Sequence, residues 1–166
     1  ATGFKQNGSI AIANNSERWE ELKRSYSMAR AFKVEAELVT PNEIAKLWPL
    51  MNTSDLIGGL FLPTDGQTNP VDTCLALAKG ARNGGATLLE GVKVTGVNHK
   101  NGIATGVSTD IGEVTAEIVV NCGGMWGRTL GGMSGVSIPL QACEHFYAIT
   151  EEIDGVPKNM PVLRDM

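Results

Sequence analysis

The chain has 166 residues, of which 42% are hydrophobic and 19% charged, so its composition excludes a disordered protein and allows a sizeable core. Its 14 basic and 18 acidic side chains give a net charge of −4, without the basic surface that nucleic-acid binding requires. No run of 18 apolar residues is present that would form a membrane-spanning helix. The sequence therefore predicts no nucleic-acid partner and no membrane span.

The strongest local signals in the first half of the chain are those of helices. Alternating apolar residues predict a short strand over residues 8–13, and a helix follows from Asn15 or Ser16. Thr40, Pro41 and Glu43 have the spacing of a capping box and predict a second helix, which Pro49 ends. A turn at residues 63–66 then marks a change of architecture.

The second half combines one more helix with predicted strands. Asn69 and Pro70 predict the start of an alanine-rich helix that ends at residues 83–85. Strands are expected over residues 87–89 and 92–97, and the pair Asn101-Gly102 favours a type I′ hairpin into residues 103–108. Two further strands are expected, over residues 114–120, covered on both faces, and over residues 138–150.

Glycines Gly123 and Gly124 follow the apolar strand predicted at residues 114–120. Two adjacent glycines at a strand-to-helix turn allow the backbone to approach a flat or phosphorylated ligand. The spacing is not that of the G-x-G-x-x-G fingerprint, and a plain tight turn explains the same residues. The sequence leaves cofactor contact and a structural turn as alternatives.

His145 and Tyr147 lie two positions apart on the last predicted strand, so they would project from one face. An imidazole and a phenol in this arrangement are able to orient an amine or carboxylate substrate. Packing residues on a half-buried strand are the alternative interpretation. His99 is expected at an exposed hairpin tip, so the two histidines do not indicate a metal site.

Cys74, Cys122 and Cys143 are odd in number and widely spaced, which excludes a disulfide framework and favours a reducing compartment. The chain begins without Met and has no polar tail at either end. We therefore expect it to be an internal fragment of a longer protein.

Several motifs together give the chain a family resemblance over nearly its whole length. The motifs are Thr2-Gly3-Phe4, Gly8-Ser9-Ile10, Trp48-Pro49-Leu50-Met51-Asn52, Asp65-Gly66 with Pro70, Gly80-Ala81-Arg82, Val94-Thr95-Gly96-Val97, Val119-Val120-Asn121-Cys122, Trp126 and His145-Phe146-Tyr147. In their order and spacing they resemble the sarcosine and dimethylglycine dehydrogenases, which are D-amino-acid-oxidase-like flavoproteins.

The resemblance implies a mixed α/β fold, in which an FAD-binding domain is interleaved with a substrate domain built on an antiparallel sheet. Residues 1–64 would belong to the substrate domain and residues 65–138 to the FAD-binding domain. Residues 139–166 would be the return strand of the substrate domain. The isolated fragment is expected to bind FAD weakly or not at all, because other parts of the family's cofactor cradle lie outside these residues.

The resemblance also assigns roles to individual residues. FAD would lie against the main chain of Val94 and against a turn that continues from the strand. Tyr147, with His145, would face the substrate. The residues of the turn would be Asn121, Cys122, Gly123, Gly124 and Trp126.

The activity implied is oxidative demethylation of sarcosine or dimethylglycine, with hydride transfer from the N-methyl carbon to flavin N5. Folate or an electron acceptor would be a further partner, in a bacterial cytoplasm or a mitochondrial matrix. The isolated fragment is expected to be inactive. Two alternatives stay open: an oxidase that uses molecular oxygen, and a noncatalytic relative such as the pyruvate dehydrogenase phosphatase regulatory subunit.

Overall fold

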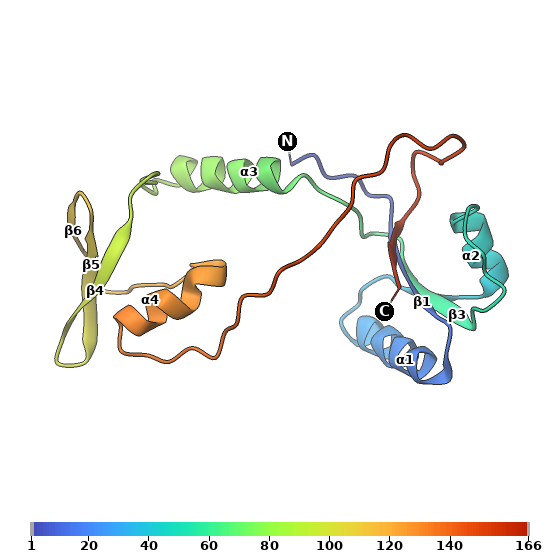
Figure 1. Cartoon of the computed structure of the whole chain (residues 1–166), viewed down its shortest axis with the longest axis horizontal. Helices are drawn as coiled ribbons and strands as arrows, with labels where there is room; N and C mark the ends of the chain where they lie inside the picture. Colours follow the sequence, from blue (N-terminus) through green and yellow to red (C-terminus); the bar gives the residue numbers. More distant parts are fainter. Residues whose placement is uncertain (1, 166) are drawn as a thin grey trace. The chain divides into compact units, whose positions relative to one another are not determined.

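The computed structural model describes residues 2–165 as two compact units of mixed α/β structure. The first unit combines the residues up to 86 with those from 151 onward, and the second comprises residues 87–150. Figure 1 shows the elements of both units in chain order. Among the described residues, no helix has the length and apolar character needed to cross a membrane.

The first unit is built on a four-stranded sheet in the order β2-β3-β1-β7. Strand β1 (Ser9–Ala13) pairs antiparallel with β3 (Gly58–Leu62), which pairs antiparallel with β2 (Glu37–Val39). The other edge of β1 pairs in parallel with β7 (Val162–Arg164), so the chain returns to its first strand near its end. Both three-residue strands, β2 and β7, were missed in the sequence because so short a strand has no readable periodicity.

Side chains alternate between the two faces of β1 and thereby separate two apolar clusters. Ile10 and Ile12 pack with Val39 and with Ile44 of helix α2 (Pro41–Leu47). Ala13 packs on the other face with Leu60 and with Leu22 of helix α1 (Ser16–Ala31). The sheet is therefore covered by one helix on each face.

The helices begin where the sequence predicts. The Asn15 side chain accepts a hydrogen bond from the Arg18 backbone N–H and caps α1. Thr40 and Glu43 form the expected capping box at α2, and the Asn69 side chain caps α3 (Pro70–Asn83). Helix α3 buries none of its residues.

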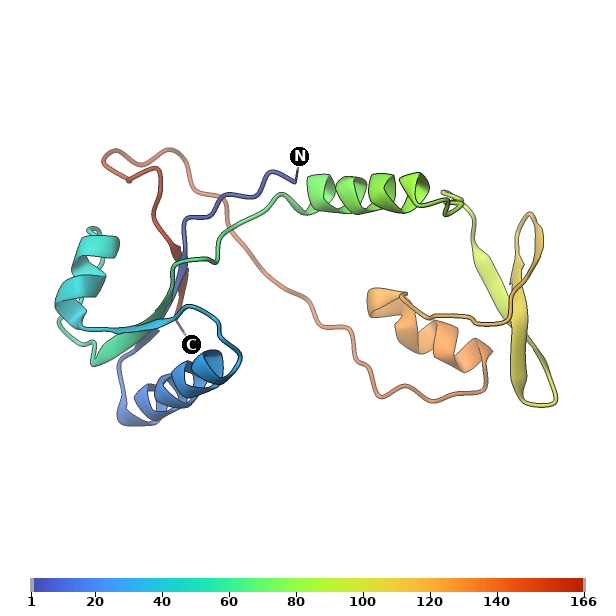
Figure 2. The ribbon, with the colours of Figure 1, turned by 180° about the vertical axis from the view of Figure 1, so that it is seen from behind.

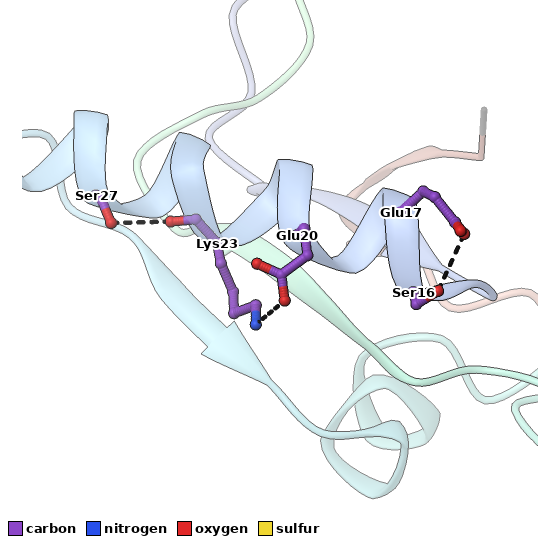
Figure 3. A network of polar contacts seen from close by, with 5 residues as sticks. All are labelled: Ser16, Glu17, Glu20, Lys23 and Ser27. Carbon is purple, nitrogen blue, oxygen red and sulfur yellow. Dashed lines mark hydrogen bonds and ion pairs between the residues drawn. The ribbon is translucent and has the colours of Figure 1, made fainter.

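The outward face of α1 carries a string of polar contacts, shown in Figure 3. Ser16 Oγ donates to Glu17 at 3.1 Å, Lys23 pairs with Glu20 one turn earlier, and Ser27 Oγ donates to the Lys23 carbonyl at 3.0 Å. These contacts are solvent-exposed, and exposed ion pairs add little to stability. This face is therefore a solvated helix surface.

The second unit contains a three-stranded antiparallel sheet and one helix. Strand β4 (Val94–Lys100) turns through Asn101 and Gly102 into β5 (Ile103–Thr109), which pairs with β6 (Gly112–Thr115). The short 3-10 helix η1 (Gly124–Trp126) leads into α4 (Gly127–Met133), which packs next to β4. Figure 2 shows the strands in yellow and α4 in orange.

Three strand predictions for this unit are wrong. Residues 87–89 form no strand, and residues 138–150 make no backbone ladder with any described strand. The strand predicted over residues 114–120 ends at Thr115, and Ile118 and Val120 are 79% and 74% exposed instead of covered. The reason is the same in each case: a strand requires a hydrogen-bonding neighbour, and the described residues supply none there.

Candidate functional site

The turn that follows residue 120 is held by one side chain. Asn121 Oδ1 accepts a hydrogen bond from the Gly123 N–H at 3.0 Å, and Asn121 Nδ2 donates to the Gly127 carbonyl at 2.9 Å. The Trp126 N–H also donates to the Gly123 carbonyl at 2.9 Å. The Asn121 amide thus joins both ends of the turn and fixes its conformation.

Glycine occupies the two positions Gly123 and Gly124 of this turn for two different structural reasons. A Cβ on Gly123 would lie 2.5 Å from Leu130 Cδ1, so the absence of a side chain lets α4 pack against the turn. Gly124 has a φ of +52° and no heavy atom within 4 Å of the place where a Cβ would be. Its positive φ favours glycine, and its backbone remains open to an approaching group.

A hollow of about 190 Å³ lies between the sheet of the second unit, α4 and the start of the turn. Three of the predicted cofactor residues, Val94, Asn121 and Cys122, line it together. Its other walls are mainly apolar: Val97, Ala104, Val107, Val119, Val120, Leu130 and Ser134. The remaining predicted residues, Gly123, Gly124 and Trp126, follow directly along the chain, with Trp126 67% exposed.

His145 and Tyr147 are not among the residues that line this hollow. They lie in a segment without regular structure, and Tyr147 is 85% exposed. Because no strand forms there, the alternation that would place both side chains on one face is not imposed. Their contact with a substrate therefore stays a prediction.

A second, more polar hollow lies in the first unit, and sequence reasoning missed it. Ser9, Arg18, Asp65 and Arg164 are among the residues that line it. The sequence did carry a signal for Arg18, because it precedes the buried Leu22 by four residues and so shares its helix face. The hydroxyl of Ser9 and the N–H of Gly66 donate to Asp65 and hold the pKa of its carboxyl below its usual range.

The complete chain, residues 1–166, matches the family model for FAD-dependent oxidoreductases of the D-amino-acid-oxidase type. The chain belongs to this family. The resemblance seen in the motifs of the sequence is confirmed.

Three curated relatives cover 99% of the chain. Human mitochondrial sarcosine dehydrogenase is 42% identical over 169 residues, and rat mitochondrial dimethylglycine dehydrogenase is 35% identical over 167. The mouse mitochondrial pyruvate dehydrogenase phosphatase regulatory subunit is 37% identical over 167 residues. The chain spans only 18–20% of the length of these relatives.

Solved structures agree with the family assignment. L-Proline dehydrogenase from P. horikoshii matches 81% of the chain with a TM-score of 0.74 and 32% identity, and the match covers 36% of that enzyme. Glycine oxidase from Geobacillus kaustophilus matches 82% of the chain with a TM-score of 0.65 and 29% identity, also over 36% of its length. The predicted fold class, a mixed α/β fold of the D-amino-acid-oxidase type, is therefore confirmed.

Proposed function

We propose that the protein carrying this chain oxidatively demethylates a small N-methylated amino acid, sarcosine or dimethylglycine, with FAD as its cofactor. The observation that carries the proposal is the 42% identity to human sarcosine dehydrogenase over 99% of the chain. Identity at this level over the whole chain favours a common chemistry more strongly than a shared fold alone would. We also propose the domain assignment expected from the sequence. Residues 1–64 and 139–166 belong to the substrate domain, and residues 65–138 belong to the FAD-binding domain.

The hollow lined by Val94, Asn121 and Cys122 fits one part of the cofactor. An apolar cavity of about 150 Å³ holds a benzene ring, so the 190 Å³ found here suits one ring system of FAD but not the whole molecule. Gly124 adds open backbone beside it. We assign the adenosine and pyrophosphate end of FAD to Val94 and to the turn residues Asn121, Cys122, Gly123, Gly124 and Trp126.

When bound, FAD supplies at its N5 atom the acceptor for the hydride that leaves the substrate's N-methyl carbon. The role of the chain is to position the amine and to favour its neutral form, whose lone pair assists departure of the hydride. Tyr147 orients this amine through its hydroxyl, together with His145 two positions earlier in the sequence. Water would then hydrolyse the iminium product to formaldehyde and the demethylated amine, or the one-carbon unit would pass to folate.

A noncatalytic role is the second candidate, and the 37% identity to the mouse phosphatase regulatory subunit favours it. In that case the turn at Asn121 would be a remnant of a flavin site. The presence of the segment His145-Phe146-Tyr147 in this sequence supports the enzyme instead. A third possibility, an oxidase that passes electrons to molecular oxygen, differs from a dehydrogenase only in the electron acceptor.

The compartment proposed for the protein is a mitochondrial matrix or a bacterial cytoplasm. The human and rat relatives are named as mitochondrial, and a 37% identical relative is the 4-methylaminobutanoate oxidase of the bacterium Paenarthrobacter nicotinovorans. The three exposed free thiols, Cys74, Cys122 and Cys143, are suited to either compartment because both are reducing.

The proposal is tested by the absorbance of the purified, full-length protein after reconstitution with FAD. If the protein is the enzyme, it should retain the flavin absorbance at about 450 nm, and sarcosine should bleach this absorbance in the absence of oxygen. Glycine, which lacks the N-methyl group, is the matched control and should leave the absorbance unchanged. Retained flavin that neither sarcosine nor dimethylglycine reduces would refute the demethylase, and failure to retain flavin would favour the regulatory role.

A further inference from the structure

The polar hollow of the first unit has a volume of about 480 Å³. It lies beside α1, with strands β1, β3 and β7 contributing side chains to its walls; Figure 1 shows these elements together. Small-molecule sites commonly measure about 300–1,000 Å³, so the hollow has room for a small organic ligand. Its polar walls are formed by Ser9, Arg18, Glu21, Ser25, Asp65 and Arg164.

Arg18 is the buried one among the charged members of this set, because its side chain is only 9% exposed. Its Nη1 atom lies 2.7 Å from Glu21 Oε2, but its Nε atom is buried and has no hydrogen-bond partner. A buried guanidinium N–H without an acceptor is unfavourable, and an anionic oxygen is the acceptor that suits it best. Arg18 thus brings a donor without a partner to the wall of the hollow.

Arg164 adds a second guanidinium from β7. Arg164 pairs with Ala11 of β1 in the parallel ladder, and both residues line the hollow. The acidic side chains of the hollow already have partners: Glu21 pairs with Arg18, and Asp65 accepts hydrogen bonds from Ser9 and Gly66. The charged donors of the hollow are the two arginines, of which Arg164 also lowers the pKa of Asp65 through its charge.

We propose that this hollow binds the carboxylate of a small organic acid, with Arg18 Nε as one donor and Arg164 as the second. The planar guanidinium matches the geometry of a carboxylate. A doubly charged phosphate is disfavoured because the carboxylates of Glu21 and Asp65 line the same hollow. The inference does not depend on the proposed function, since it requires neither flavin nor turnover.

The test follows the NMR signal of the Arg18 Nε–H group in the purified protein during titration with acetate at constant ionic strength. The signal is assigned by its loss in Arg18→Met. A saturable shift with acetate, and a similar one with sarcosine, is expected, whereas methylammonium should produce none. Absence of a saturable shift with acetate would overturn the proposal, and tighter binding of inorganic phosphate would overturn the assignment to carboxylates.

Variants locate the binding site. Arg164→Met should weaken acetate binding about tenfold, because a charge-assisted hydrogen bond is lost. Arg18→Lys keeps the charge but removes the Nε–H, so acetate binding, followed here by calorimetry, should also weaken about tenfold. Arg24→Met, on the exposed part of the same helix, is the matched control and should bind as the wild type does. Wild-type affinity in both Arg164→Met and Arg18→Lys would contradict the site, even if Arg18→Met failed to fold.

Discussion

Ser9 on β1 and Asp65 in the turn after β3 are joined by a hydrogen bond of 2.5 Å between Ser9 Oγ and Asp65 Oδ2. The bond connects positions 56 residues apart, and Ser9 is only 6% exposed. It is the main reason why the pKa of the Asp65 carboxyl lies below its usual value, and the Gly66 N–H contributes further. The ionised carboxylate is therefore favoured in the folded state.

In Ser9→Ala, the free energy of unfolding is expected to depend less on pH under acidic conditions than it does in the wild type. Because the folded-state pKa of Asp65 is depressed, its stabilisation is present above the unfolded pKa of about 3.9 and is lost as the pH falls through the folded pKa. The variant should thus lose unfolding free energy at neutral pH and lose less on acidification than the wild type. Urea unfolding at a series of pH values measures this. Ser54→Ala is the control, and parallel profiles for wild type and Ser9→Ala would contradict the prediction.

Ile44→Ala is expected to destabilise the first unit by about 2–5 kcal/mol. Ile44 is fully buried, and its side chain packs α2 against Ile10 and Ile12 of the sheet, so truncation leaves a cavity. Val71→Ala on α3 removes a side chain that is 64% exposed and should change the free energy of unfolding by less than about 0.5 kcal/mol. Urea denaturation compares the two variants, and equal losses would mean that α2 does not depend on this core.

Two glycines with open surroundings isolate the effect of backbone conformation. At both Gly80 in α3 and Gly102 in the β4–β5 turn, an added Cβ would meet no heavy atom within 4 Å, but Gly102 has a φ of +79°. Gly80→Ala should stabilise α3 by about 0.5–1 kcal/mol, whereas Gly102→Ala should destabilise the hairpin by about 1–2 kcal/mol. Amide hydrogen exchange in each element measures the local change, and the same sign for both would contradict the argument.

The features that sequence predicts well here are those decided by neighbouring residues. The side chains of Asn15, Thr40 and Asn69 cap their own helices, so a few residues contain the whole signal. The Asn101-Gly102 hairpin is equally local, since both residues adopt the positive φ that a type I′ turn requires. Such signals do not depend on the rest of the fold.

The features that sequence predicts poorly depend on distant partners. The apolar run that includes Ile118 and Val120 has strand propensity, but it has no described strand beside it and remains exposed. Arg18 is buried beside a hollow whose walls come from α1 and from strands near both ends of the chain, so its surroundings depend on tertiary packing. Among the candidate cofactor residues, the shared hollow of Val94 and Asn121 is likewise formed by tertiary packing, and it was expected only through the family resemblance.

Tyr147→Phe tests the candidate substrate residue in the full-length protein. Tyr147 is 85% exposed, so loss of its hydroxyl should change the free energy of unfolding by less than about 0.5 kcal/mol. If the hydroxyl orients the substrate amine, loss of one hydrogen bond should slow reduction of the bound flavin by sarcosine about tenfold in stopped-flow measurements. Tyr26→Phe, on α1, is the matched control and should react at the wild-type rate. An unchanged rate in Tyr147→Phe would remove this residue from the site, whereas slow reduction with unaltered flavin binding would assign it to substrate positioning.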